Sequence, residues 1–139
     1  GGAEFMRAIP EAVYGIPPEQ IIGSSGKVDF ELRDGEPVFV KLSEISDVDD
    51  KAGKPININL HIGRRPLLAF GNSDGDAEML QYVHPEDDGG PRLGLLVHHD
   101  DAEREYAYDS NFSSALMDEA EERGWIVVST KDDWATIFP

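Results

Sequence analysis

The sequence contains no cysteine, which excludes disulfide bonds and thiolate metal sites. It is also poor in basic residues, since 12 lysines and arginines stand against 28 acidic residues and leave a net charge of −16. A field of that sign repels the phosphate backbone and argues against nucleic acid as a partner. No apolar run has the length of a membrane span, and the first residues do not resemble a signal peptide. We therefore expect a cytoplasmic protein with no nucleic-acid or membrane partner.

A length of 139 residues with 40% apolar residues is enough for a packed core, and we expect a single domain over residues 1–139. Alternation on both sides of Asp34-Gly35 predicts a β-hairpin, followed by a polar loop over 43–55. Continuous apolar runs predict buried strands at 67–70, 93–97 and 125–129. Helical patterns are found at 5–14, 56–62, 77–83 and 114–123, and the segment HHDDAERE from His98 is expected to open another helix.

Strands and helices alternate through the second half of the chain, a pattern typical of a parallel sheet with helices on its faces. The expected fold is therefore α/β, a three-layer Rossmann-like parallel sheet with flanking helices and a β-hairpin insertion. In such sheets ligands bind beyond the carboxyl ends of the strands. Two polar segments come directly after strands in this way: GNSDGD from Gly71, and HHDD from His98. Because adjacent residues of a strand face opposite sides, His98 and His99 are expected to be polar groups at this end rather than ligands of one metal.

The segment GNSDGD has three interpretations. Glycine, asparagine and aspartate are common in turns and helix caps, so it can be a plain strand-to-helix turn. A calcium loop of the EF-hand type is excluded, because Ala77 stands where that loop needs glycine and Val83 where it needs glutamate. A magnesium site is the third interpretation, since Mg²⁺ prefers hard oxygen ligands, retains several waters and needs few protein groups.

The segment LLAFGNSDGDAEML, from Leu67 to Leu80, resembles the fourth motif of the haloacid dehalogenase-like hydrolase superfamily, an apolar strand followed by G-[DN]-x-x-x-D. Two later segments, LGLLVHHDDAEREYAYD and ALMDEAEERGWIVVSTKDDWATIF, are similar to the region after that motif in one group of these proteins. The resemblance is nearest to the phosphoserine-phosphatase-like branch and covers its carboxyl-terminal portion.

The resemblance implies a magnesium cofactor. It assigns direct coordination of the metal to Asn72, contact with the metal or its waters to Asp76, and an outer position to Asp74. The third motif of the family is a lysine that balances the charge of the phosphoryl group. Lys54 is the better match for this catalytic lysine, and Lys51 is the alternative. Without the resemblance, either lysine would be interpreted as a solvent-exposed surface residue.

The first motif of the family, D-x-D-x-[TV] after an apolar strand, supplies the attacking aspartate and is absent here. The second motif is a hydroxyl residue often followed by Gly-Gly. Gly1 and Gly2 match the residues after that hydroxyl, next to the substrate phosphate, or are cloning remnants. We therefore expect the carboxyl-terminal part of a larger enzyme, with motifs three and four present and motif one, the cap and the motif-two hydroxyl absent.

The expected function is part of a Mg²⁺-dependent phosphatase that hydrolyses a small-molecule phosphate ester through an aspartyl-phosphate, inactive as this fragment. The alternative belongs to another class of protein. It is a non-catalytic acidic module for binding or oligomerisation on a decayed phosphatase scaffold, forming homo-oligomers through an exposed sheet edge.

Overall fold

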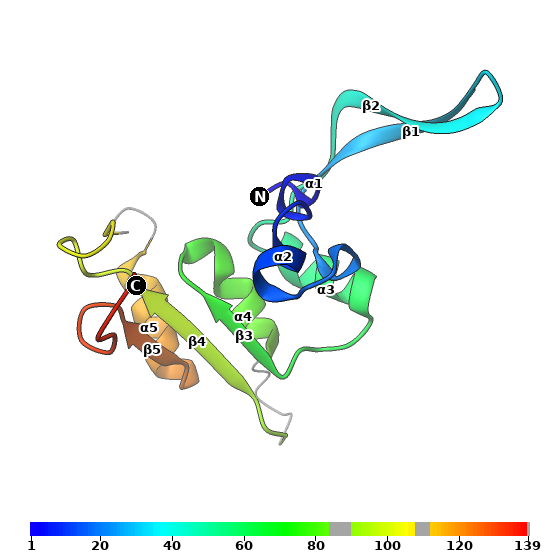
Figure 1. Ribbon diagram of the computed structural model, residues 1–139. Helices are drawn as coiled ribbons and strands as arrows, with labels where there is room; N and C mark the ends of the chain where they lie inside the picture. Colours follow the sequence, from blue (N-terminus) through cyan, green and yellow to red (C-terminus); the bar gives the residue numbers. More distant parts are fainter. Residues whose placement is uncertain (84–89, 108–111, 139) are drawn as a thin grey trace. The chain divides into compact units, whose positions relative to one another are not determined.

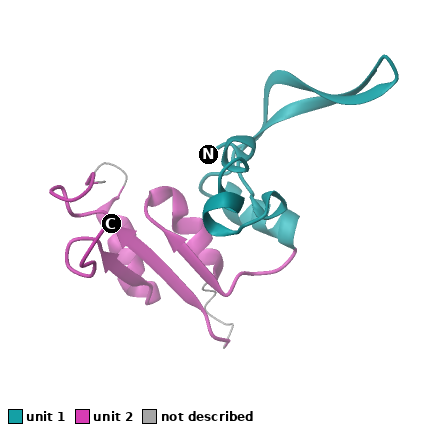
Figure 2. Cartoon of the chain, viewed as in Figure 1, with its two compact units in different colours: residues 1–62 teal, residues 63–139 magenta. Residues whose placement is uncertain are grey.

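The computed structural model describes residues 1–83, 90–107 and 112–138 of the chain. This part is mixed α/β and divides into two compact units, unit 1 (residues 1–62) and unit 2 (residues 63–139), which Figure 2 distinguishes by colour. Unit 1 contains a two-stranded antiparallel sheet, and unit 2 contains a three-stranded parallel sheet (Figure 1). Within the described ranges, no helix is long and apolar enough to cross a membrane.

Unit 1 combines short helices with a long hairpin. In chain order its elements are α1 (Ala3–Met6), α2 (Pro10–Tyr14), the 3-10 helix η1 (Pro18–Gln20), β1 (Ser25–Arg33), β2 (Glu36–Asp47) and α3 (Gly53–Ile62). The prediction of a single helix over residues 5–14 is therefore wrong, because the helical conformation is interrupted between α1 and α2. Pro10 has no N–H to continue a helix and instead takes the first turn of α2. Gly15 ends α2 in the left-handed conformation, with φ +68°.

The hairpin confirms the turn predicted at Asp34-Gly35, where both residues have positive φ (54° and 86°) as a two-residue turn requires. The polar loop expected from residue 43 is partly wrong. Pairing of Gly26 with Ile45 and of Ser25 with Asp47 carries β2 further than the hydropathy pattern indicated. Figure 1 shows the two strands extending as a ribbon from the helices of unit 1.

Unit 2 contains the parallel sheet. Its elements are β3 (Leu68–Gly71), the 3-10 helix η2 (Asp74–Asp76), α4 (Ala77–Val83), β4 (Leu93–His98), α5 (Ser114–Arg123) and β5 (Ile126–Ser129). The strands lie in the order β3-β4-β5, and both pairs are parallel. The bounds predicted for α4 and α5 are confirmed, including the end of α5 at Gly124, with φ +68°. These findings establish the parallel α/β core that the alternation predicted.

One face of the sheet carries the core of unit 2. Ala69 and Leu96 point to this face and pack with Leu80 and Val83 of α4 and with α5. Both crossover helices lie on this side, as right-handed β-α-β connections require when successive strands are added in one direction (Figure 1).

The opposite face is apolar throughout, and its residues range from half-buried to exposed. We call it the open face; it comprises Leu68, Phe70, Leu93, Leu95, Val97, Ile126 and Val128. Leu68 is 46% exposed, Phe70 56% and Ile126 50%. The expectation that residues 67–70 are covered on both faces is therefore wrong. In the described part of unit 2 the sheet has one helical layer, not the two that a three-layer fold needs.

The segment after β4 also differs from expectation. Residues 100–106 form turns rather than a helix. The spacing of Asp100 and Glu103 is that of a capping box and predicts Asp100 as the cap. Asp101 supplies it instead: its Oδ1 accepts hydrogen bonds from the backbone N–H groups of Glu103 (3.1 Å) and Arg104 (3.0 Å). The composition of the segment HPEDDGGP, residues 84–91, predicts an exposed turn, but most of it, residues 84–89, lies outside the described residues.

Candidate functional site

The candidate site lies at the carboxyl end of β3, where the chain leaves the sheet. Asp76 is 5% exposed and its Oδ2 turns back toward the start of the loop. That oxygen accepts hydrogen bonds from the backbone N–H of Asn72 (2.9 Å), the backbone N–H of Ser73 (3.2 Å) and the Ser73 hydroxyl (3.3 Å). Asp76 therefore fixes the loop and keeps its own carboxylate beside Asn72.

Gly71 permits this close packing. A Cβ at residue 71 would lie 2.5 Å from the Cβ of Asp76, a separation that real side chains do not adopt. The motif has glycine at this position, and the structure explains why: a larger residue would clash with Asp76.

Asp74 points to a different partner. Its Oδ1 accepts hydrogen bonds from the backbone N–H (3.0 Å) and the hydroxyl (2.9 Å) of Ser113, the N-cap residue of α5. The carboxylate thus connects the segment between β3 and α4, residues 72–76, to the start of α5; we call this segment the β3 loop. The predicted outer position of Asp74 at a metal remains a prediction.

The two adjacent histidines at the end of β4 have separate surroundings, as expected from their position in a strand. The ring of His98 stacks on Phe112 with centroids 4.3 Å apart. His99 reaches toward the β3 loop, where its Nε2 lies 3.3 Å from Nδ2 of Asn72, while its Nδ1 lies 2.7 Å from Oε2 of Glu105. His99 therefore joins two strand ends that are separate in sequence.

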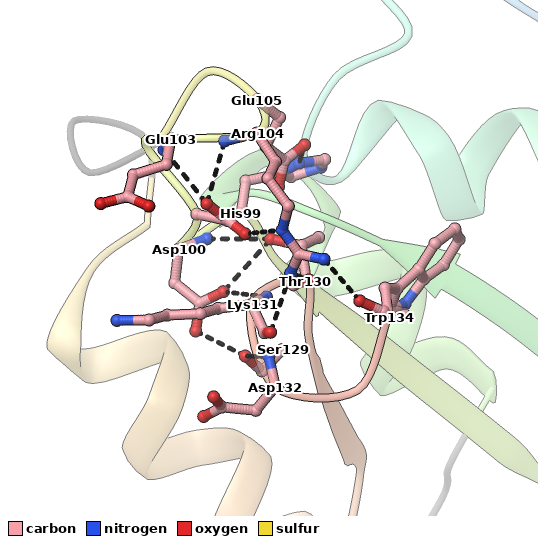
Figure 3. A network of polar contacts seen from close by, with 11 residues as sticks. His99, Asp100, Glu103, Arg104, Glu105, Ser129, Thr130, Lys131, Asp132 and Trp134 are labelled. Carbon is pink, nitrogen blue, oxygen red and sulfur yellow. Dashed lines mark hydrogen bonds and ion pairs between the residues drawn. The ribbon is translucent and has the colours of Figure 1, made fainter. Parts of the chain in front are cut away.

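A second polar network connects the loops after β4 and β5 (Figure 3). Arg104 donates to the backbone carbonyls of Thr130 (2.9 Å), Lys131 (2.8 Å) and Trp134 (2.8 Å), and it pairs with Asp101. Asp101, Asp100, Glu103, Arg104 and Lys131 are among the residues that line an open pocket here. Because the donors and acceptors already satisfy one another, this network holds the two loops in place.

Three carboxylates around these loops have lowered pKa values. Burial opposes ionisation of Asp100, but hydrogen bonds from the Ser129 hydroxyl, the Lys131 N–H and the Thr130 hydroxyl outweigh it and lower the pKa to about 2. Burial likewise opposes ionisation of Glu105, yet hydrogen bonds from Thr130 and His99 lower its pKa. The hydrogen bond from Arg104 is the main cause of the lowered pKa of Asp101.

The remaining predicted residues belong to unit 1. Lys54 lies in the first turn of α3, which begins three residues before the helix predicted over 56–62. Lys51 precedes that helix with φ +50°. The backbone of Gly2 forms an isolated parallel bridge with Ser24, whose N–H donates to the carbonyl of Gly1 (3.0 Å). Their roles toward a phosphate remain predictions.

The oxygen atoms of the β3 loop are of the chemical type that Mg²⁺ prefers, but the described side chains are too few to hold the ion. The carboxamide of Asn72 and the carboxylate of Asp76 carry hard oxygen atoms, and the backbone N–H of Asn72 donates a hydrogen bond to Asp76. Within residues 1–83, 90–107 and 112–138, however, no group of three or more histidine, cysteine, aspartate or glutamate side chains is arranged to hold a metal. The described residues therefore do not form a complete metal site.

Comparison with protein-family models gave no match, and comparison with curated proteins gave none either.

Proposed function

We propose that the chain is the carboxyl-terminal part of a Mg²⁺-dependent phosphomonoester hydrolase of the haloacid dehalogenase-like type. The observation that carries the proposal is the position of Asn72 and Asp76. Both residues follow a parallel strand directly, at the end of the sheet where α/β proteins bind ligands, and the Asp76 carboxylate accepts a hydrogen bond from the backbone N–H of Asn72.

The free edge and the exposed face of the sheet in unit 2 support the proposal that the fold is incomplete. β3 is an edge strand of the described sheet, so one side of it is available for a further strand. Parallel sheets are normally covered on both faces, whereas the open face leaves Leu68 and Phe70 exposed. A strand beside β3 and helices over the open face would complete the fold, and such a strand would bring a nucleophilic aspartate next to Asn72.

In the complete enzyme, Asn72 and Asp76 would hold Mg²⁺ together with aspartates from that strand. The bound ion would neutralise charge that develops on the transferred phosphoryl group. Lys54 would contribute a second positive charge at the phosphate, an assignment based on the motif resemblance. Gly1 and Gly2 would offer backbone groups to the phosphate on the same basis. Asp76 has a further task, since its hydrogen bonds keep the loop in place before any ligand binds.

The experiment compares hydrolysis of a generic phosphomonoester with Mg²⁺ by two proteins, this chain and a form extended upstream in its own gene. We expect turnover from the extended form and none from the 139-residue chain, which lacks the D-x-D-x-[TV] motif. A folded but inactive extended form, or the absence of an upstream reading frame, would refute the proposal. Turnover by the 139-residue chain would show that the nucleophile lies within it.

A second candidate function is an acidic binding or oligomerisation module. The open face and the edge of β3 favour it, since large exposed apolar surfaces mark sites of association. Light scattering on the purified chain separates the two proposals: a stable oligomer that Phe70→Lys dissociates would favour the module, while a monomer would count against it.

A further inference from the structure

The hairpin of β1 and β2 has two faces of different chemistry. Residues that lie opposite each other in an antiparallel pair point to the same side, and successive residues of a strand alternate between the two sides. One side is apolar. We call it the aromatic face; it comprises Val28, Phe30, Leu32, Pro37 and Phe39. The other side carries the ion pair of Arg33 with Glu31 (3.0 Å), and its valines, Val38 and Val40, are half-buried.

The aromatic face is open to solvent. Phe30 is 63% exposed, Leu32 66% and Phe39 74%, although the two phenylalanine rings contact each other edge to face with centroids 6.1 Å apart. Figure 1 shows the two strands as a ribbon that extends from the helices of unit 1. A two-stranded hairpin is at best marginally stable in water unless another layer packs on it, and contiguous exposed apolar patches mark sites of association. The aromatic face is therefore a candidate interaction surface.

The size of the aromatic face corresponds to a small protein interface. A phenylalanine buries about 150–250 Å² when it is fully covered. The exposed parts of Phe30, Phe39, Leu32 and Val28 therefore amount to about 500 Å² on one copy of the chain. Two copies stacked face to face would remove about 1,000 Å² from water, which is the lower limit for a specific interface.

The charges at the two ends of the aromatic face are complementary between copies. Lys41 lies opposite Val28 at the base of the hairpin, and Asp34 lies in the turn at the other end. When two hairpins stack in opposite directions, Lys41 of each copy comes near Asp34 of the other. Lys41 pairs with Glu4 of α1 but its side chain remains 71% exposed, so it can approach a second carboxylate. A two-fold arrangement of this kind closes on itself, because each copy offers one aromatic face.

We propose that the aromatic face is the contact surface of a homodimer, in which two hairpins stack face to face in opposite directions. The surface consists of residues of unit 1, whereas the open face belongs to unit 2, and the dimer does not depend on the proposed phosphatase function. The net charge of −16 makes two copies repel each other. The dimer is therefore weak at low salt and becomes tighter as salt screens the repulsion.

Sedimentation equilibrium of the 139-residue chain, at about 0.05 M and about 0.5 M NaCl, tests the proposal. Phe30→Lys and Phe39→Lys each place a charge in the aromatic face, whereas Phe39→Leu keeps an apolar side chain there. Phe70→Lys is the matched control, because it makes the same change at an exposed phenylalanine of the open face. Circular dichroism checks that each variant is folded, which we expect because all three phenylalanines are more than half exposed.

We expect wild type to form a dimer whose Kd falls as salt rises. A two-fold contact contains each residue twice, so Phe39→Lys should raise the Kd at least about thirtyfold, and Phe30→Lys should have a similar effect. Phe39→Leu should raise the Kd less than about tenfold, since it removes only part of the apolar contact. The control Phe70→Lys should dimerise as wild type does.

Three results would overturn the proposal. A wild-type chain that stays monomeric at about 100 μM in both salt concentrations would reject the homodimer. A dimer that Phe70→Lys dissociates and Phe39→Lys does not would assign the association to the open face. Binding of a monomeric chain to phosphatidylcholine vesicles, lost in Phe39→Lys, would assign the aromatic face to a lipid surface instead of a second copy.

Discussion

Replacement of Asp76 tests whether the acidic loop is held together by its own carboxylate. Asp76→Ala removes the oxygen that accepts from the two backbone N–H groups of Asn72 and Ser73, at a residue only 5% exposed. A buried donor left without an acceptor costs about 1–3 kcal/mol. Partial access of water to the loop reduces that cost, so we expect Asp76→Ala to lower the free energy of unfolding by about 2–4 kcal/mol.

Asp76→Asn is the matched variant. It keeps the shape and an acceptor oxygen but loses the charge, so the expected loss is about 1 kcal/mol. Urea unfolding followed by the fluorescence of the buried Trp125, which belongs to the same core, measures both variants. If Asp76→Ala unfolds at the same urea concentration as wild type, the loop does not depend on this carboxylate and our account of it is wrong.

Four further perturbations test other contacts and surfaces of the protein. Gly71→Ala should cost about 1–3 kcal/mol in urea unfolding, since the added Cβ meets Asp76; unchanged stability would show that the loop has another conformation. The ionised form of Asp100 is the stabilised one, so its contribution, about 1–2 kcal/mol after solvent screening, is full above the unfolded pKa of 3.8 and is lost as pH falls toward 2. Acid titration of Asp100→Asn should show a flatter profile over this range than wild type, and identical profiles would contradict the assignment. Arg104→Met should leave carbonyls of the loop after β5 without their donor and speed its cleavage by protease; an unchanged cleavage rate would argue against the network. Phe70→Lys should change stability by no more than about 0.5 kcal/mol and reduce binding of a hydrophobic dye, whereas a cost above about 2 kcal/mol would show that the open face is covered.

Local signals in the sequence predict the elements of unit 2 well. Helix α5 is predictable with its bounds because Ser113 caps its start and Gly124 ends it, and both signals lie within a few residues of the helix. The hairpin turn at Asp34-Gly35 is predictable for the same reason, since two residues fix its geometry.

Features that the sequence does not reveal depend on contacts distant in the chain. The run of apolar residues in β3 indicates cover on both faces, but hydropathy cannot show whether a second layer exists to cover it. The turns after β4 resemble the start of a helix in sequence, because their stabilising partner, the loop after β5 that Arg104 contacts, lies about 30 residues away.

The candidate site is predictable only in its first part. The motif G-N-x-x-x-D identifies Asn72 and Asp76, and the structure brings them together. The contact between Asn72 and His99 is not predictable from the sequence, because the two residues are 27 positions apart and are brought together by the pairing of β3 with β4. The signal that could have found it is the position of His99 directly after a strand parallel to β3.

Mg²⁺-dependent turnover of a phosphomonoester by the upstream-extended protein, measured for Asp76→Asn and Asp74→Asn in parallel, tests the central claim most directly. Both variants remove one negative charge from the same loop, but the carboxylate of Asp74 is engaged with Ser113, whereas Asp76 lies beside Asn72. We predict that Asp76→Asn lowers turnover about a hundredfold or more and that Asp74→Asn stays within about tenfold of wild type. Equal activity of wild type and Asp76→Asn would contradict the assignment of the β3 loop as part of a catalytic metal site.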